Sequence, residues 1–217
     1  MNGSLPDPIF LVAILVFLSL APFVAIMVTS FVKLVVVLSL IRNALGIQQI
    51  PPNMVINGLA LILSLYIMNP VAQETFEILQ RNPIDAKNVA SIQAAATAGQ
   101  EPLRAFLLKH SSERERQFFF NAAKRLWPPG RSANLNPNDL MILVPAFTVG
   151  ELTSAFQIGF LIYLPFIAID IIVSNILLSM GMMMVSPMTI SLPFKLLLFV
   201  TVDGWTRLIH GLVMTYA

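Results

Sequence analysis

The chain has 217 residues, of which 57% are hydrophobic and only 11% are charged, and its mean hydropathy is +0.80. Because a soluble domain has about 25% charged residues, these values exclude a disordered chain, a nucleic-acid tail and an ordinary cytosolic enzyme. They indicate a membrane-associated protein. The formal net charge of +2 rests on too few charges to indicate a polyanionic partner. The chain has no cysteine, so disulfides, thiolate metal sites and thiol nucleophiles are excluded.

The charges are distributed unevenly along the chain. Residues 69–140 hold nine of the 13 basic residues and seven of the 11 acidic ones. The other charged residues are Asp7, Lys33, Arg42, Glu151, Asp170, Lys195, Asp203 and Arg207. We therefore predict three parts. An N-terminal apolar helical hairpin occupies 1–68, a polar helical insert occupies 69–140, and C-terminal apolar helical hairpins with a methionine-rich loop occupy 141–217.

The first apolar run, 9–28, is long enough to cross a hydrocarbon core of about 30 Å as a helix. A turn-like segment at 48–53 precedes a second, shorter apolar run at 54–68. The first basic residue is Lys33, so we expect no cleaved signal at the N-terminus. The positive-inside rule places the loop with Lys33 and Arg42 in the cytoplasm, and the polar insert would then lie outside.

Two helical stretches are predicted in the insert, an alanine-rich one at 84–97 and a charged one at 101–127. Apolar runs at 141–156, 158–185 and 188–202 follow, and a short amphipathic tail ends the chain. Prolines, each of which removes a helix hydrogen bond, lie in or between the apolar runs at Pro22, Pro145, Pro165, Pro187 and Pro193. Irregular backbone at membrane depth persists only where protein or a water-filled cavity covers it. We therefore expect broken helices that pack against other helices or other subunits.

The sequence offers little that could carry catalysis. Neither His110 nor His210 has an HExxH or carboxylate spacing around it, and the serines lack a nearby His/Asp arrangement. Gly181 is followed by methionines and not by a phosphate-binding motif. We therefore expect no enzymatic activity, no cofactor, no metal and no nucleic-acid partner.

Isolated charges in apolar segments are candidate functional residues. Asp170 and Lys195 are each the only charge of their run, and an unpaired buried charge costs several kcal/mol. Mutual pairing, within a chain or between copies, is one solution, and a separate solvated cavity for each is the alternative. Asp203 and Arg207, four residues apart, are predicted to form a local pair on one helix face. Glu151 has no evident partner and is a candidate contact with another subunit.

The run SMGMMM at 179–184 is unusual in composition. Methionine is unbranched and soft, so Met182, Met183 and Met184 could either fill a core or form a deformable gate. Composition alone favours core packing, but Gly181 before the triplet and Pro187 after it indicate a loop or a helix break, which strengthens the case for a gate.

Three segments of the chain resemble the FliP/SctR family, whose members are core components of type III secretion and flagellar export apparatuses. The segments are LIRNALGIQQIPPN at 40–53, PAFTVGELTSAFQIGFLIYLPF at 145–166 and DIIVSNILLSMGMMMVSPMTISLPFKLLLFV at 170–200, followed by DGW at 203–205. The resemblance covers residues 20–217 apart from the insert. Flagellar members typically begin with a cleaved signal, so we expect the injectisome branch.

The resemblance implies an all-α, membrane-associated subunit of helical hairpins with broken helices. Family members form a homopentamer and, with SctS-like and SctT-like subunits, a cone-shaped export gate that also meets the SctU-like switch subunit. The gate is associated with lipid of the Gram-negative inner membrane, stands largely on the periplasmic side and passes unfolded secretion substrates. The resemblance implies that Met182, Met183 and Met184 form a gasket around the passing chain, and that Asp170 and Lys195 are the family's buried charge pair.

We therefore carry three functional hypotheses. The first is a structural, pore-forming subunit of a protein-export gate. The second is a proton-coupled small-solute transporter in which Asp170 is a proton relay, although transporters usually show inverted repeats and none is visible. The third is a membrane-anchored scaffold whose interaction domain is the insert, 69–140.

Overall fold

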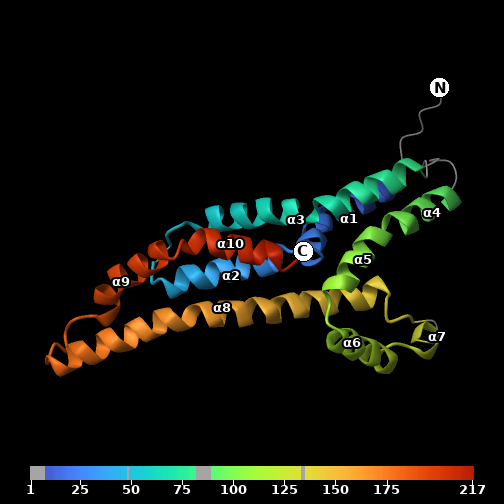
Figure 1. The fold of residues 1–217 in the computed structure, drawn as a ribbon. Coiled ribbons are helices and arrows are strands. Elements are labelled where there is room, and N and C mark those ends of the chain that lie inside the picture. The colour runs from blue at the N-terminus through green and yellow to red at the C-terminus, as the bar shows by residue number, and fades with distance from the viewer. Residues whose placement is uncertain (1–7, 48, 82–88, 133–134) are drawn as a thin grey trace.

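The structure is a computed structural model that describes residues 8–47, 49–81, 89–132 and 135–217. Within these ranges every regular element is an α-helix, which confirms the predicted all-α fold class. The helices are α1 (Pro8–Met27), α2 (Phe31–Ala44), α3 (Asn53–Arg81), α4 (Val89–Gly99), α5 (Glu101–His110), α6 (Glu113–Leu126), α7 (Pro129–Ser132), α8 (Leu140–Ser179), α9 (Pro187–Thr201) and α10 (Gly204–Met214) (Figure 1).

The centre of the molecule is the packing of α2 between α8 and α3 (Figure 1). Leu34, Val37, Leu38 and Ile41 follow helical spacing on α2 and are at most 1% exposed. They form one core with residues from the neighbouring helices, namely Ile56, Ala60, Ala155, Phe166, Phe199, Leu208 and Leu212. Burial of this stripe fixes the helices that carry the candidate site.

Helix α8 is continuous over 40 residues, with Pro145 and Pro165 inside it. The apolar run at 141–156 and most of the run at 158–185 therefore belong to one helix, which neither proline breaks. Each proline removes one backbone hydrogen bond, but α8 packs against α2, α5, α6 and α9 along its length. This packing supports the helix across both prolines.

Broken helices occur elsewhere, at two bends. The segment Leu18–Met27 meets Phe31–Ala44 at 64°, and Pro187–Thr201 meets Gly204–Met214 at 59°. Among the described residues, α3 and α8 are each long and apolar enough to cross a membrane, and these residues would form up to four spans if each bent pair is one span. At the first bend Ser30 is fully buried and its hydroxyl donates to the hydroxyl of Ser64 at 3.2 Å.

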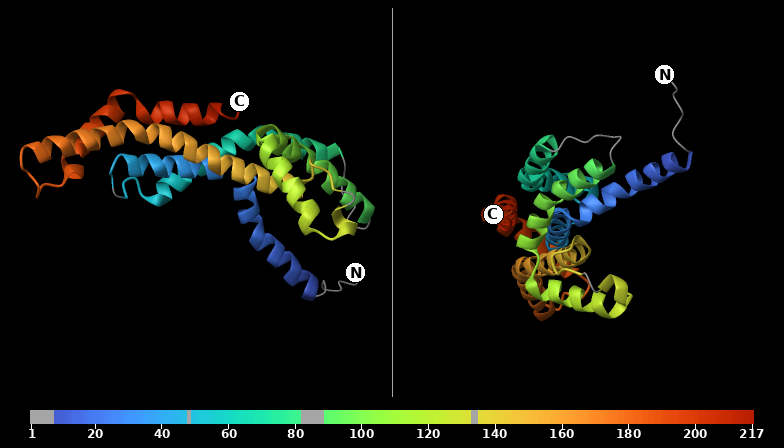
Figure 2. Two further views of the ribbon diagram at one scale, coloured as in Figure 1. Left: turned by 90° about the horizontal axis from the view of Figure 1, so that it is seen from below. Right: turned by 90° about the vertical axis from the view of Figure 1, so that its right-hand side faces the viewer.

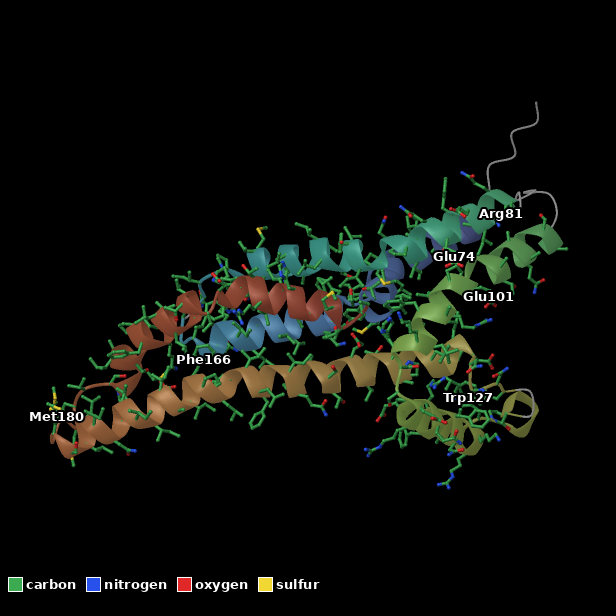
Figure 3. All side chains as sticks on the ribbon, viewed as in Figure 1. Glu74, Arg81, Glu101, Trp127, Phe166 and Met180 are labelled. Carbon is green, nitrogen blue, oxygen red and sulfur yellow. The ribbon has the colours of Figure 1, made fainter. Side chains whose placement is uncertain are left out.

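The polar insert gathers at one end of the elongated molecule, where Figure 3 labels Glu101 and Trp127, whereas Met180 lies at the opposite end. Helix α3 continues through the predicted boundary at 68–69 and ends at Arg81. The stretch predicted at 101–127 is divided into α5 and α6 at Ser111–Ser112, because the Ser112 side chain caps α6 by accepting from the Glu115 N–H. Part of the stretch predicted at 84–97 lies outside the described residues; the rest belongs to α4.

Candidate functional site

The methionine loop, residues 180–186, joins α8 to α9 at the far tip of the molecule (Figure 1). Gly181 has φ of +70°, a conformation that suits glycine because it has no Cβ. Its N–H donates to the Leu178 carbonyl at 3.1 Å and the Met182 N–H to the Leu177 carbonyl at 2.9 Å, which ends α8 in a Schellman motif. Pro187 then begins α9.

The methionine side chains of this loop are exposed in the chain on its own. Met184 is 101% exposed, Met183 82% and Met182 41%. These values contradict core packing within this chain, because a core side chain touches many neighbours. The loop therefore presents a flexible apolar surface at the tip of the molecule.

Asp170 and Lys195 lie across the α8–α9 hairpin and form an ion pair within the chain. The Lys195 ammonium donates to Asp170 Oδ2 at 2.6 Å, and the Ser191 hydroxyl donates to Asp170 Oδ1 at 2.6 Å. The Lys195 side chain is 4% exposed, whereas that of Asp170 is 31% exposed. The structure thus brings the two residues together, with water access on the carboxylate side only.

Lys195 also reaches helix α2. Its ammonium donates to the carbonyl oxygen of Ala44, the last residue of α2, at 3.2 Å. The carbonyl end of a helix carries partial negative charge, which favours a cation there. One buried lysine therefore joins α2, α8 and α9, and its partner Asp170 lies about 14 Å along α8 from the end of that helix at Ser179.

Glu151 has its partners inside the chain, so the expected contact with another subunit is not what the structure shows. Its Oε1 lies 2.8 Å from the ammonium of Lys33, and its Oε2 accepts a hydrogen bond from the hydroxyl of Tyr216. Both charged side chains are at most 6% exposed. The signal for this pair was present in the sequence, because Lys33 and Glu151 are also isolated charges in apolar runs.

Aromatic side chains surround Tyr216. Its ring stacks on Phe106 at 6.2 Å, lies 5.2 Å from the His110 ring and has the Lys33 ammonium 4.4 Å from its centroid. Burial raises the pKa of the Tyr216 phenol, and the neighbouring Glu151 carboxylate adds to the rise. The hydroxyl therefore remains a donor to Glu151. This cluster joins the insert to α2 and α8.

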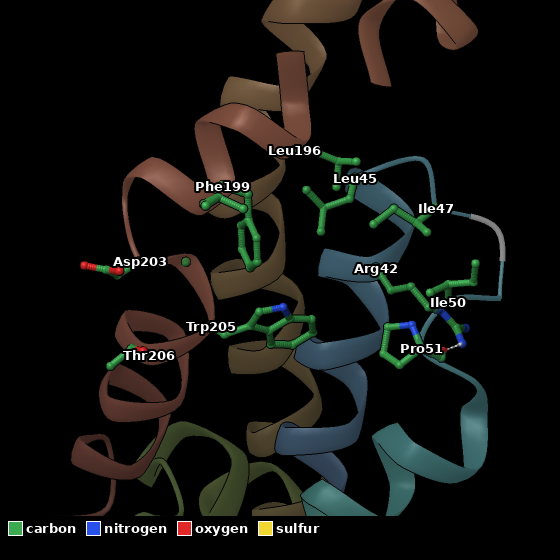
Figure 4. A pocket seen from close by; sticks show the side chains of 12 residues that line it. Arg42, Leu45, Ile47, Ile50, Pro51, Leu196, Phe199, Asp203, Trp205 and Thr206 are labelled. Carbon is green, nitrogen blue, oxygen red and sulfur yellow. Dashed lines mark hydrogen bonds between the residues drawn. The ribbon is translucent and has the colours of Figure 1, made fainter. Parts of the chain in front are cut away.

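Asp203 and Arg207 do not form the predicted pair: in the part of the chain that the structure describes, no ion pair joins them. The reason is the bend between α9 and α10, where Asp203 has φ of +52° and precedes the first residue of α10. Asp203 and Arg42 instead line an apolar pocket of about 400 Å³ between the α2–α3 turn and this bend (Figure 4). Arg42 is held there by the Pro51 carbonyl at 3.2 Å.

Comparison with known proteins gives close relatives over nearly the whole chain. It is 58% identical over 213 residues to the Yop proteins translocation protein R of Yersinia pestis, covering 98% of both chains. It is 51% identical over 219 residues to the virulence protein YscR of Salmonella typhimurium, covering 99% of this chain and 100% of the relative. It is 50% identical over 208 residues to the hypersensitivity response secretion protein HrcR of Ralstonia nicotianae, covering 95% and 96%. The model of the FliP family matches residues 14–212, so the chain belongs to the FliP family.

Proposed function

We propose that this protein is a structural, pore-forming subunit of a type III secretion export gate, which conducts unfolded proteins across the inner membrane of a Gram-negative bacterium. The relatives named for translocation, virulence and secretion support a role in secretion machinery. Helices α3 and α8, which are apolar and long enough to cross a membrane, support a membrane location. The proposed role includes no catalytic step.

The exposed methionine loop is the observation that carries this proposal. A closed export pore must block ions and small solutes and must also pass a polypeptide of any sequence. Copies of Met182, Met183 and Met184 arranged around an axis would form a soft apolar ring that excludes water when empty and reshapes around a substrate. A rigid or charged ring would fail in one of these two tasks.

The Asp170–Lys195 pair has a supporting role in this proposal. Because Lys195 bonds to Asp170 on α8 and to the Ala44 carbonyl on α2, it fixes the α8–α9 hairpin to the centre of the molecule. The α8–α9 hairpin can then hold the methionine loop in a defined position relative to α2. We propose that copies of this chain form a homopentamer with SctS-like and SctT-like subunits beside an SctU-like subunit, because a ring needs several loops.

Replacing the methionine triplet tests the proposal. In cells with the full gate, Met182→Ala, Met183→Ala and Met184→Ala together should leave assembly intact and raise permeability to ions and small molecules. The matched control replaces three exposed methionines outside the loop, namely Met54, Met141 and Met214, which are 85%, 73% and 69% exposed. The control should not leak. Unchanged permeability in a correctly assembled loop variant would contradict the gasket.

A further inference from the structure

Helix α10 and the turn after it present one buried stripe to the rest of the molecule. Leu208 and Leu212 lie in the core formed with α2, α3 and α8. Tyr216 follows at the same spacing of four and is 8% exposed. Residues four apart share one face of a helix, so the three side chains hold the C-terminal segment against the helical core.

Two leucines alone define the position of α10 along its axis poorly. Because Leu208 and Leu212 are four residues apart, these two side chains alone do not distinguish the observed register from one displaced by a helical turn, about 5 to 6 Å. A buried polar residue can specify register, because a slip leaves its partner unsatisfied. Tyr216 has this property, since its hydroxyl donates to Glu151, which is 3% exposed.

The contacts of Tyr216 come from several elements. Glu151 belongs to α8, Lys33 to α2 and Phe106 to α5, and the C-terminal end of the chain lies close to the junction of α1 and α2 (Figure 1). A slip by one turn would remove the phenol donor from Glu151 and the ring from Lys33. Glu151 would stay paired with Lys33, but its Oε2 would lose its donor while it remains buried, a loss that the apolar contacts of α10 do not share.

The position of α10 is coupled to that of α9 by close packing at the bend between them. A Cβ at Gly204 would lie 2.3 Å from Phe199 Cδ2, so the two helices approach closely at this point. Phe199 is itself buried against Trp205, at 5.5 Å between ring centroids. A displacement of α10 along its axis would therefore displace the end of α9.

We propose that Tyr216 is a positioning residue that sets the register of α10 against the α2–α8 pair, by joining the C-terminal turn to the buried Lys33–Glu151 ion pair. This assignment does not depend on the gasket function of the methionine loop. It concerns the placement of the last helix and, through the bend, of α9.

A distance measurement on the full chain tests the proposal. Tyr66 on α3 and Met214 on α10 are 71% and 69% exposed and line the same pocket of about 450 Å³. The chain has no cysteine, so Tyr66→Cys and Met214→Cys place two nitroxide labels without interference. The labelled chain is diluted into unlabelled chain in the assembled gate, so that only distances within one subunit are recorded.

The parent chain should give one narrow distance peak. Tyr216→Phe retains an aromatic ring but removes the hydroxyl, and it should add a peak displaced by about 5 to 6 Å. Tyr216→Leu keeps the apolar stripe and should give the same displaced peak. Tyr163→Phe, which removes a phenol hydroxyl from α8 but does not alter Glu151, is the matched control and should leave one peak.

The spectra are recorded well below the unfolding temperature, so a loss of stability alone would not move the peak. A displaced peak in the folded Tyr216→Phe chain, absent from the control, supports the assignment. One unshifted narrow peak in Tyr216→Phe would overturn it, and so would an equal displacement in Tyr163→Phe. If Tyr216→Phe does not accumulate, the same two outcomes in Tyr216→Leu decide the matter.

Discussion

The two members of the ion pair below the methionine loop differ in their access to water. The Asp170 carboxylate is partly exposed and also accepts from Ser191, whereas the Lys195 ammonium is almost fully enclosed. A carboxylate that loses its lysine can still be hydrated. A buried ammonium that loses its carboxylate keeps only the Ala44 carbonyl. Removing Asp170 and removing Lys195 should therefore lower the free energy of unfolding by different amounts.

Asp170→Ala should destabilise the protein more than Lys195→Met does. The first change leaves an uncompensated buried cation, at a cost of about 3–5 kcal/mol. The second leaves a partly hydrated carboxylate, and the methionine stem fills the space of the lysine stem. Thermal unfolding of the two variants in detergent measures the order. Glu74→Ala, at an exposed carboxylate of α3 that forms no ion pair among the described residues, is the control, and equal losses for all three variants would contradict the argument.

Isolated charges in apolar runs favoured the Asp170–Lys195 contact, because each residue needed a partner, but the structure was required to exclude a separate solvated cavity for each. Lys33 and Glu151 are also isolated charges in apolar runs, but they are more than a hundred residues apart, so the sequence did not indicate that they pair. Tyr216 could not have been found from the sequence. Its role depends on α10 folding back along α2, a tertiary contact that no local pattern specifies.

His110 gives the stability of the protein a pH dependence. Burial, and then the charges of Lys109 and Lys33, lower the pKa of His110 below its ordinary value of 6.5. The unfolded chain therefore binds a proton at higher pH than the folded chain, and the free energy of unfolding falls as the pH drops below that value. The lowered pKa favours the neutral ring beside Tyr216.

Unfolding midpoints at about pH 8 and about pH 5.5 measure this effect. We expect the midpoint to fall with acidification less in His110→Gln than in the parent chain, because glutamine does not titrate. His210→Gln, at an exposed position on α10, should behave like the parent. An unchanged slope in His110→Gln would show that other groups control the acid response.

At the scale of the elements, the close approach of α2 and α8 depends on one glycine. A Cβ at Gly159 would lie 2.3 Å from Leu40 Cδ1 and 3.2 Å from Leu40 Cβ. Gly150, on the same helix, has nothing within 4 Å of the corresponding position. Glycine inside a helix is otherwise unfavourable by about 1 kcal/mol relative to alanine. Its presence at 159 is explained by the space that Leu40 occupies.

Gly159→Ala should lower the free energy of unfolding by about 1–2 kcal/mol, because overpacking outweighs the gain in helix propensity. Gly150→Ala should raise it by about 0.5–1 kcal/mol, because only the propensity changes. Leu40→Ala combined with Gly159→Ala should cost less than the sum of the two single changes. Denaturant titration of the four chains measures all of these values, and stabilisation by Gly159→Ala would contradict the close contact.

The existence of the apolar helices could be predicted from run length and hydropathy, but their ends could not. Pro145 and Pro165 suggested breaks, yet tertiary packing carries α8 through both. The bends occur where the chain has other features. One lies at the buried Ser30 and the other at Asp203–Gly204, where a left-handed residue precedes a glycine that packs on Phe199.

The whole molecule exposes more apolar surface than a monomer in water would. The outer face of α3 carries Met54, Val55, Leu61, Ile62, Leu65 and Tyr66, each more than half exposed. Helix α8 carries a second face with Phe156, Phe160 and Leu161. Helix α1 extends away from the rest of the chain (Figure 2). Apolar patches of this kind mark contact with other subunits or with lipid.

We expect the chain to be a homopentamer when it is made with its SctS-like and SctT-like partners, because one copy cannot cover these faces. Native mass spectrometry of the purified gate measures the copy number. Phe160→Glu, on the exposed face of α8, should reduce the assembled fraction, whereas Gln73→Glu, at an exposed polar position of the insert away from that face, should not. A stable monomer in the presence of both partners would rule out this assembly.

The two buried ion pairs have a mechanical consequence for the secretion cycle. Lys33 near the start of α2 bonds to Glu151, and Lys195 joins the last carbonyl of α2 to Asp170, so α2 is attached to α8 at both of its ends. The two attachment points on α8 are 19 residues apart (170 minus 151), or about 28 Å. Neither sliding nor rotation of α2 along α8 is possible without breaking a buried ion pair. In the proposed export gate, opening should therefore move α2 and the centre of α8 as one rigid body, and the deformation should be confined to the methionine loop and the bends.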